Sequence, residues 1–200
     1  VAGAHGKSTT TAILASILQS SALIGAISKD FGSNFRYVND LIAFEADESD
    51  ASFLLSNPYC AIVTNAEPEH MEYYHYDYDK FYESYERFIS LATKKVVNGE
   101  DKDIKKLKIE DATYLYPSKD IKNLCYTLRD NQTCNKFDLK ELGTFEVWGF
   151  GFQMASNDSL GILAALNELD VETIRKNLLN YKDIKKRFDI VQSNDKFVVI

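Results

Sequence analysis

The sequence predicts an α/β fold, built on a mostly parallel sheet flanked by helices, with a small antiparallel sheet added. In the first half of the chain, apolar runs of strand length alternate with stretches of helical period, which is typical of a parallel sheet covered by helices. Between residues 123 and 148 the pattern changes to short alternating segments, which are typical of antiparallel strands. The chain has 200 residues, 45% of them hydrophobic, so it can bury the core of one large domain.

The first half of the chain predicts two helices and four strands. A helix is expected over residues 9–19, and its apolar face comprises Ile13, Leu14, Ile17 and Leu18. Short buried strands are expected at residues 23–27, 41–45, 60–64 and 95–98. A second helix is expected over residues 77–90, because Phe81, Tyr85 and Phe88 recur at helical spacing. We assign this aromatic stripe to packing, since such stripes lie in cores more often than they line a cofactor.

The second half predicts a small antiparallel sheet and two more helices. Strands are expected at residues 124–128 and 144–148, separated by a polar turn at residues 131–133. Helices are expected over residues 157–168 and 171–181. Asp170 precedes the last helix, where its carboxylate can accept a hydrogen bond from the first turn and act as an N-cap.

The start of the chain, VAGAHGKSTTT at residues 1–11, is typical of a phosphate-binding loop between a strand and a helix. Gly3 and Gly6 permit backbone conformations that let several N–H groups turn inward at the helix start. The helix dipole favours an anion there, Lys7 can reach the outer phosphates, and the Ser8 hydroxyl can hold Mg²⁺. The alternative is a glycine-rich turn capping an ordinary helix, because the two glycines stand closer together than in the usual signature.

Two polar clusters follow expected strands. The first has four acids within residues 45–50, and the second, at residues 64–71, contains Glu67 and His70. Ligands of open parallel sheets bind beyond the carboxyl ends of the strands. Mg²⁺ needs few protein oxygens, because water and phosphate supply the rest. Either cluster alone is equally typical of a solvated loop, but both together behind a phosphate loop favour an ATP–Mg²⁺ site.

Charge and composition exclude several classes of protein. The net charge of −7 argues against a nucleic-acid partner, which requires a basic surface. No apolar run is long enough to span a bilayer and no signal segment opens the chain, so we expect no membrane partner. The three cysteines have no metal-ligand spacing, which favours a reducing, cytoplasmic location.

The two ends of the sequence suggest a fragment of a longer polypeptide. The chain begins with Val1, and the strand expected before the phosphate loop is represented only by Val1 and Ala2. The last residues, 197–200, have the composition of a strand that is cut in mid-course. We therefore expect missing segments both upstream and downstream.

The three motifs, at residues 3–11, 45–50 and 64–71, together resemble those of the Mur ligases, the ATP-dependent amide-forming enzymes of peptidoglycan precursor synthesis. The short glycine spacing is that family's own form of the phosphate loop. The resemblance spans nearly the whole chain and implies a P-loop-type fold. It also implies that residues 1–187 are the central ATP-binding domain and that residues 188–200 are a linker and the truncated start of the C-terminal ligase domain. A UDP-sugar-binding domain would precede this fragment.

The resemblance also implies roles for particular residues. The catalytic residues would be Lys7 and His70, and Ser8 and Glu67 would bind Mg²⁺. The residues that bind ATP would be Gly3, Ala4, His5, Gly6, Lys7, Ser8, Thr9 and Asn157. Asn34 and Glu48 would approach the substrate.

Within the family, the sequence is most similar to the branch that joins L-alanine to UDP-N-acetylmuramate. The branch that recycles murein tripeptide usually has a tyrosine at the position of Ser49, and it remains the alternative. A nucleotide-binding module of another P-loop ATPase, or a folate-type polyglutamate ligase, is a further alternative. On its own, the fragment is expected to bind nucleotide without ligase turnover.

Several positions depart from the family pattern. Ala4 and Ser8 stand where the family usually has threonine. Ser90 stands where a histidine often binds a second metal ion, and a serine hydroxyl is a poorer ligand for that task. Ser156 replaces the histidine of a histidine–asparagine pair. Lys186 replaces the first of two arginines, so the charge is kept but the planar fork is lost.

Overall fold

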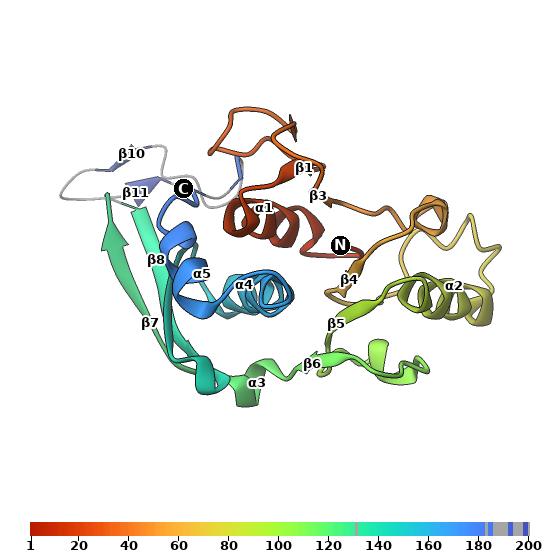
Figure 1. Ribbon diagram of the computed structural model, residues 1–200. Helices are drawn as coiled ribbons and strands as arrows, with labels where there is room; N and C mark the ends of the chain where they lie inside the picture. The colour runs from red at the N-terminus through yellow and green to blue at the C-terminus, as the bar shows by residue number, and fades with distance from the viewer. Residues whose placement is uncertain (131, 183, 186–191, 194–197, 200) are drawn as a thin grey trace.

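The computed structural model describes residues 1–130, 132–182, 184–185, 192–193 and 198–199. A parallel sheet lies between two helical layers, and a small antiparallel sheet packs beside them (Figure 1). This confirms the α/β class that the sequence predicts. The expected boundary between residues 187 and 188, and the pair Lys186 and Arg187, lie outside the described residues.

The parallel sheet is assembled from two sets of strands. In the first set, β1 (Ser21–Leu23) pairs with β3 (Ile42–Phe44) in parallel and with β2 (Phe35–Arg36) in antiparallel orientation. In the second set, β5 (Lys94–Asn98) lies between β4 (Cys60–Val63) and β6 (Thr113–Leu115), and all three are parallel.

Val1 and Ala2 join the two sets into one sheet. The amide of Ala46 donates to the Val1 carbonyl at 2.8 Å, on the β3 side. On the other side, the amide of Ala2 donates to the Ile62 carbonyl at 2.8 Å. The two residues therefore occupy the strand position between β3 and β4, as expected, and the loop that follows them starts at the carboxyl edge of the sheet.

Side chains of the central strands alternate between the two helical layers, as a pleated strand requires. Ile62 and Val96 pack into the cluster that contains α1 (Lys7–Leu18), α4 (Phe152–Ala165) and α5 (Val171–Leu178). Val63 and Val97 pack into the other cluster, with α2 (Tyr78–Ser90). Strands with both faces covered are expected to be continuously apolar, which explains the apolar runs in the sequence.

The helix α2 confirms the aromatic stripe as core. Its buried residues include Phe81, Tyr85 and Phe88, and the ring of Phe53 stacks on Phe88 with centroids 4.8 Å apart. Phe53 lies in the short 3-10 helix η1 (Ser52–Leu55). The side chain of Asp77 caps α2 by accepting a hydrogen bond from the Lys80 amide.

The antiparallel sheet consists of β7 (Ile121–Arg129), β8 (Gln132–Leu139) and β9 (Thr144–Trp148). The middle strand corrects the sequence prediction, which placed a turn at residues 131–133. Gln132 and Thr133 instead pair with β7, and Asn131 lies outside the described residues. Polar residues such as Asn135 and Asp138 weaken the strand signal of β8, yet Phe137 and Leu139 are fully buried against the helices.

Several predicted bounds were wrong. The strand predicted at residues 23–27 is β1 and ends at Leu23, because the Gly25 amide bonds the Glu45 carboxylate instead of a neighbouring strand. The helix α1 begins at Lys7 and ends at Leu18, where Gln19 adopts a left-handed cap. The helix predicted at residue 157 begins at Phe152, and α5 ends at Leu178. Asp170 caps α5, as predicted.

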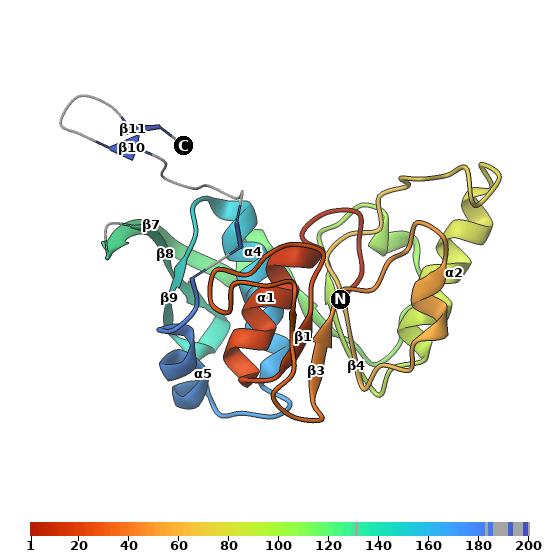
Figure 2. The same ribbon diagram turned by 90° about the horizontal axis from the view of Figure 1, so that it is seen from above.

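Shorter elements complete the described fold. They are the helix α3 (Pro117–Asp120), the 3-10 helices η2 (Ile104–Lys106) and η3 (Lys140–Leu142), and the antiparallel pair β10 (Gln192–Ser193) and β11 (Val198–Val199). The view from above shows α1 and α4 side by side in the middle of the molecule (Figure 2). Among the described residues, no helix has the length and apolar character needed to cross a membrane.

Candidate functional site

Three segments that follow strand positions meet at the carboxyl edge of the sheet. They are the loop of residues 3–6, the acidic segment after β3 and the polar segment after β4. All three strands run in the same direction, so their carboxyl ends lie at one edge, where open α/β sheets bind ligands. The sequence-based prediction that these motifs share an edge is confirmed.

The loop of residues 3–6 has the backbone of an anion cradle. Gly3 and Gly6 have φ angles of +136° and +84°, which other residues rarely adopt. Gly3 also packs too closely for a side chain, since a Cβ atom there would lie 2.2 Å from Thr64 Oγ1. Within the described part of the chain, no side chain caps the start of α1, and its first turn contains no acid.

The start of α1 therefore leaves backbone donors available for a ligand. Its first backbone bond runs from the Thr10 amide to the Gly6 carbonyl at 3.0 Å, so the amides of Lys7, Ser8 and Thr9 precede the intrahelical ladder. Together with the helix dipole, these N–H groups fit a phosphate. Ser8, the candidate Mg²⁺ ligand, is half-buried on this turn.

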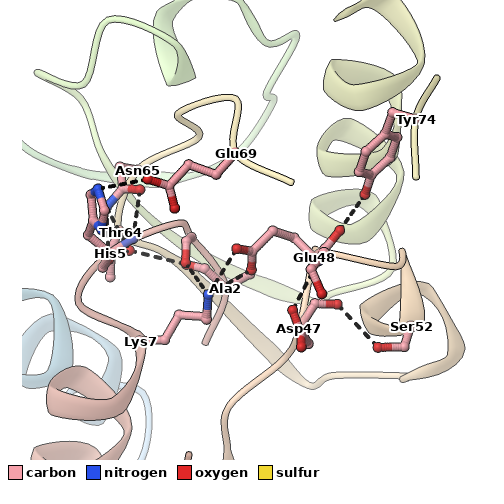
Figure 3. Close-up of polar contacts among 12 residues, drawn as sticks. Ala2, His5, Lys7, Asp47, Glu48, Ser52, Thr64, Asn65, Glu69 and Tyr74 are labelled. Carbon is pink, nitrogen blue, oxygen red and sulfur yellow. Dashed lines mark hydrogen bonds and ion pairs between the residues drawn. The ribbon is translucent and has the colours of Figure 1, made fainter. Parts of the chain in front are cut away.

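Lys7 is held over the loop by two acceptors. Its Nζ donates to the Gly3 carbonyl at 2.7 Å and to Glu48 Oε1 and Oε2 at 2.9 and 3.0 Å (Figure 3). The Lys7 and Glu48 side chains are only 16% and 2% exposed. Glu48 is thus the acid of the 45–50 cluster that contacts Lys7 at the loop of residues 3–6, whereas Glu45 bonds the Gly25 amide.

The position of Glu48 is fixed from its far side. The Tyr74 hydroxyl donates to the Glu48 carbonyl at 2.5 Å, and Figure 3 shows the tyrosine ring reaching toward it from the segment after β4. Burial raises the pKa of Tyr74, so its hydroxyl stays protonated and remains a donor. The Tyr74 hydroxyl therefore links the chain after β4 to the acidic segment after β3.

His5 lies on the outer side of the loop. Its Nε2 is 3.3 Å from Glu69 Oε1 and 3.7 Å from Glu67 Oε2, and its side chain is 62% exposed. These contacts are weak ion pairs when the imidazole is protonated. Glu67 also lies 4.0 Å from Lys102.

A cleft of about 460 Å³ opens beside the loop, a size suited to a small ligand. The residues that line it are His5, Gly6, Thr9, Thr64, Asn65, Glu67, Asn98, Asp101, Gln153, Met154 and Asn157. Asn157 is 5% exposed, and its amide lies where a side chain on Gly6 would clash, at 2.6 Å. The cleft therefore joins the loop to the start of α4.

Other predicted residues lie apart from these contacts. His70 is exposed, with a φ of +53°, and Asn34 is exposed, with its backbone carbonyl bonded to the Ile24 amide. Ser90 ends α2 just before β5 begins, and its hydroxyl donates to the Arg87 carbonyl. Since β5 runs toward the carboxyl edge, Ser90 lies at the opposite edge, roughly 15 Å from the loop side. It is therefore misplaced for a second metal ion at the loop.

The sequence did not predict the residues at the ends of β4 and β5 that support the loop of residues 3–6. Asn65 bonds the His5 backbone, Asn98 bonds the Thr64 carbonyl, and Asp101 bonds the Ala66 amide. The signal that the sequence offered for them is that polar residues occur at or shortly after the end of each apolar strand. Among the described residues, no group of three or more histidine, cysteine, aspartate or glutamate side chains is arranged to hold a metal ion.

Comparison with known proteins identifies the family. Residues 1–165 match the Mur ligase middle domain. The chain belongs to the Mur ligase family. It is 56% identical to the UDP-N-acetylmuramate–L-alanine ligase of Campylobacter curvus and 54% identical to that of Helicobacter pylori strain P12, matching 100% and 97% of this chain. The chain spans 46% and 43% of the length of these relatives.

Solved Mur ligase structures share the fold. The MurC ligase of Thermotoga maritima superposes with a TM-score of 0.77 at 21% identity, over 96% of this chain and 46% of that one. The UDP-N-acetylmuramate:L-alanyl-γ-D-glutamyl-meso-diaminopimelate ligase of Neisseria meningitides superposes with a TM-score of 0.72 at 20% identity, over 92% of this chain and 65% of that one. These likenesses confirm a Mur ligase middle-domain fold.

Proposed function

We propose that this chain is the central ATP-binding domain of a UDP-N-acetylmuramate–L-alanine ligase. The observation that carries the proposal is the glycine loop at the start of α1, where uncapped N–H groups and the fixed amine of Lys7 adjoin a cleft. The identity to ligases of that name supports the choice of substrates.

The loop would bind the phosphates of ATP. Backbone N–H groups of residues 6–9 would surround the outer phosphates, and Lys7 would supply positive charge. Asn157 would meet the nucleotide from the start of α4, because its amide adjoins both Gly6 and the cleft. The size of the cleft leaves room for the base and ribose beside the loop.

Oxygen donors near the loop suit Mg²⁺, which binds through a few hard oxygens and keeps several waters. Ser8 and Glu67 would hold it, and Glu48 is the further carboxylate at this edge. When bound, the ion would neutralise charge on the phosphates and align the transferring group.

The reaction would form an amide bond through an acyl phosphate. The carboxylate of the sugar's lactyl group would attack the γ-phosphate of ATP, which releases ADP and leaves an acyl phosphate. The amine of L-alanine would then attack the acyl carbon, lose a proton and displace inorganic phosphate. Two anions must approach each other, so neutralising charge is the main demand on the protein. Lys7 would meet it at the γ-phosphate, His70 would lie near the transferring group, and Asn34 and Glu48 would face the sugar substrate.

The longer polypeptide would supply the remaining sites. The chain spans under half of the length of the relatives it matches, so the binding sites for the UDP-sugar and for L-alanine are assigned to the missing N- and C-terminal domains. The fragment alone would then bind nucleotide without turnover. We place the enzyme in the cytoplasm, where its nucleotide substrates are found.

A murein tripeptide ligase is the second candidate, favoured by the similar fold of the Neisseria meningitides enzyme. Measuring phosphate release by the full-length protein separates the two. Release that requires both UDP-N-acetylmuramate and L-alanine supports the proposal, and release with murein tripeptide in place of L-alanine supports the second candidate. Phosphate release in the absence of UDP-N-acetylmuramate, L-alanine and murein tripeptide would indicate a plain ATPase.

A further inference from the structure

We infer that Asn65 is a positioning residue that sets the conformation of the phosphate loop before any ligand binds. The inference rests on the proposed nucleotide site, and it assigns to Asn65 the task of turning one peptide group, the one between His5 and Gly6.

The side-chain amide of Asn65 contacts both backbone groups of His5. Its Oδ1 accepts a hydrogen bond from the His5 amide at 3.1 Å, and its Nδ2 donates to the His5 carbonyl at 2.8 Å. The Thr64 hydroxyl donates to the same carbonyl at 2.6 Å (Figure 3). The His5 carbonyl therefore has two donors, both from the end of β4.

The geometry of the peptide bond makes these contacts matter for the loop. In a trans peptide, the carbonyl and the following N–H point in opposite directions. Holding the His5 carbonyl toward β4 therefore turns the Gly6 N–H away from β4. If the peptide flipped, a carbonyl oxygen would replace an N–H group in the loop and would repel a phosphate.

The backbone on either side of Asn65 is itself hydrogen-bonded. The Asn98 side chain donates to the Thr64 carbonyl at 3.1 Å, and Asp101 Oδ1 accepts from the Ala66 amide at 3.2 Å. The backbone on both sides of Asn65 is thus bonded to the segment that begins at the end of β5. Asn65 itself is only 9% exposed, so water competes weakly for its amide.

Only an amide of this length serves both His5 groups. Aspartate keeps the acceptor for the His5 amide but loses the donor to the His5 carbonyl, and alanine loses both. A ligand that binds a preformed loop does not have to order it, so a preorganised loop gives higher affinity. Asn65 would therefore contribute to affinity without being required to touch the nucleotide.

The test compares Asn65→Ala and Asn65→Asp with the parent chain. Calorimetry gives the affinity for a non-hydrolysable ATP analogue with Mg²⁺, and NMR hydrogen exchange gives the protection of the loop amides without nucleotide. We expect affinity to fall about tenfold or more in both variants, since a factor of ten corresponds to one lost interaction of ordinary strength. The His5 amide should exchange faster in the alanine variant and keep its protection in the aspartate variant.

Asn177→Ala is the matched control. It removes an amide that donates to the Ile17 carbonyl at 2.7 Å, at the far end of α1, so it should change thermal stability without changing affinity. Parent-like affinity and loop exchange in both Asn65 variants would overturn the inference. If the parent itself binds no nucleotide, the proposed function fails, and the exchange rates still decide whether Asn65 fixes the loop.

Discussion

The amine of Lys7 lies within 3.0 Å of both carboxylate oxygens of Glu48, and Glu48 is almost fully buried. An acid from the segment after β3 thus neutralises the cation at the start of α1. The Gly3 carbonyl holds the same amine at 2.7 Å. The lysine is therefore positioned in advance, and an arriving phosphate would have to share it with Glu48.

Replacing Glu48 by glutamine tests this sharing. Glu48→Gln keeps an oxygen acceptor for Lys7 but removes the negative charge, so the affinity for nucleotide without Mg²⁺ should rise by roughly tenfold, as for a gain of about 1.4 kcal/mol. Calorimetric titration with an ATP analogue in the presence of a chelator measures it. Unchanged affinity would mean that the Lys7 amine does not contact the anion.

Substituting Gly3 by alanine should distort the loop. A Cβ atom at Gly3 would meet Thr64 Oγ1 at 2.2 Å and the Asn65 carbonyl at 2.9 Å, in addition to the strain of the positive φ. We expect a loss of roughly 2 kcal/mol or more in the free energy of unfolding and a loss of nucleotide binding. Denaturant unfolding and calorimetry measure the two effects.

Gly32→Ala is the control for Gly3→Ala. Gly32 also has a positive φ, +69°, but no atom lies within 4 Å of a Cβ there. It should cost about 1 kcal/mol from backbone strain alone and should leave nucleotide binding unchanged. Equal effects of the two substitutions on binding would contradict a specific role for the packing of Gly3 on Thr64.

Asp30 should make the stability depend on pH. Burial raises its pKa from 3.8 to about 6, against the opposing effects of hydrogen bonds and of Arg36. The folded state therefore holds this proton more tightly than the unfolded state, so stability is lost as the pH rises from about 4 to 6. After allowing for its partial exposure, we expect a contribution of roughly 1 to 2 kcal/mol.

Asp30→Asn removes the titrating group at this position. As the pH rises from 4 to 7, the parent should lose this contribution and the variant should not. The free energy of unfolding of the variant should therefore rise by this amount relative to that of the parent. Urea unfolding across that range gives the two curves. Parallel curves would show that the Asp30 pKa is the same in the folded and unfolded states.

Ser90 should have no part in metal binding. Its hydroxyl bonds the Arg87 carbonyl at the end of α2, at the opposite edge of the sheet from the loop. Ser90→Ala should therefore leave the Mg²⁺ dependence of nucleotide binding unchanged, with a stability change of under about 0.5 kcal/mol. A weaker Mg²⁺ effect in this variant would show that Ser90 reaches the metal site after all.

Much of the fold could be predicted because its signals are local. Polar residues follow the apolar runs of β3 and β4 directly in the sequence. This pattern predicted that two motifs lie at one edge of the sheet. The bounds of β1 could not be predicted, because the chain leaves the strand where Gly25 bonds Glu45, a residue 20 positions away. The strand β8 was missed because its exposed face carries Lys136 and Asp138.

The site was predictable in its parts but not in its contacts. The glycine loop, Lys7 and the acids follow from motifs, whereas the partner of Lys7 depends on how β3 lies beside Val1. The contact between His5 and Asn65 joins residues 60 positions apart, and no local pattern in the sequence indicates it. The sequence named Ser90 only as a poorer ligand than the histidine of the family, and the edge of the sheet at which it lies follows from the direction of β5.

The most direct test of the nucleotide site is calorimetric titration of this chain with a non-hydrolysable ATP analogue, with and without Mg²⁺. Lys7→Ala is the test variant, and Lys80→Ala, which removes an exposed lysine on α2, is the matched control. Thermal unfolding of each variant checks that it is folded. The predicted result is binding that depends on Mg²⁺, that is lost in Lys7→Ala and that is kept in Lys80→Ala. No binding by the folded parent, or equal binding by the folded Lys7→Ala variant, would contradict a phosphate site at this loop.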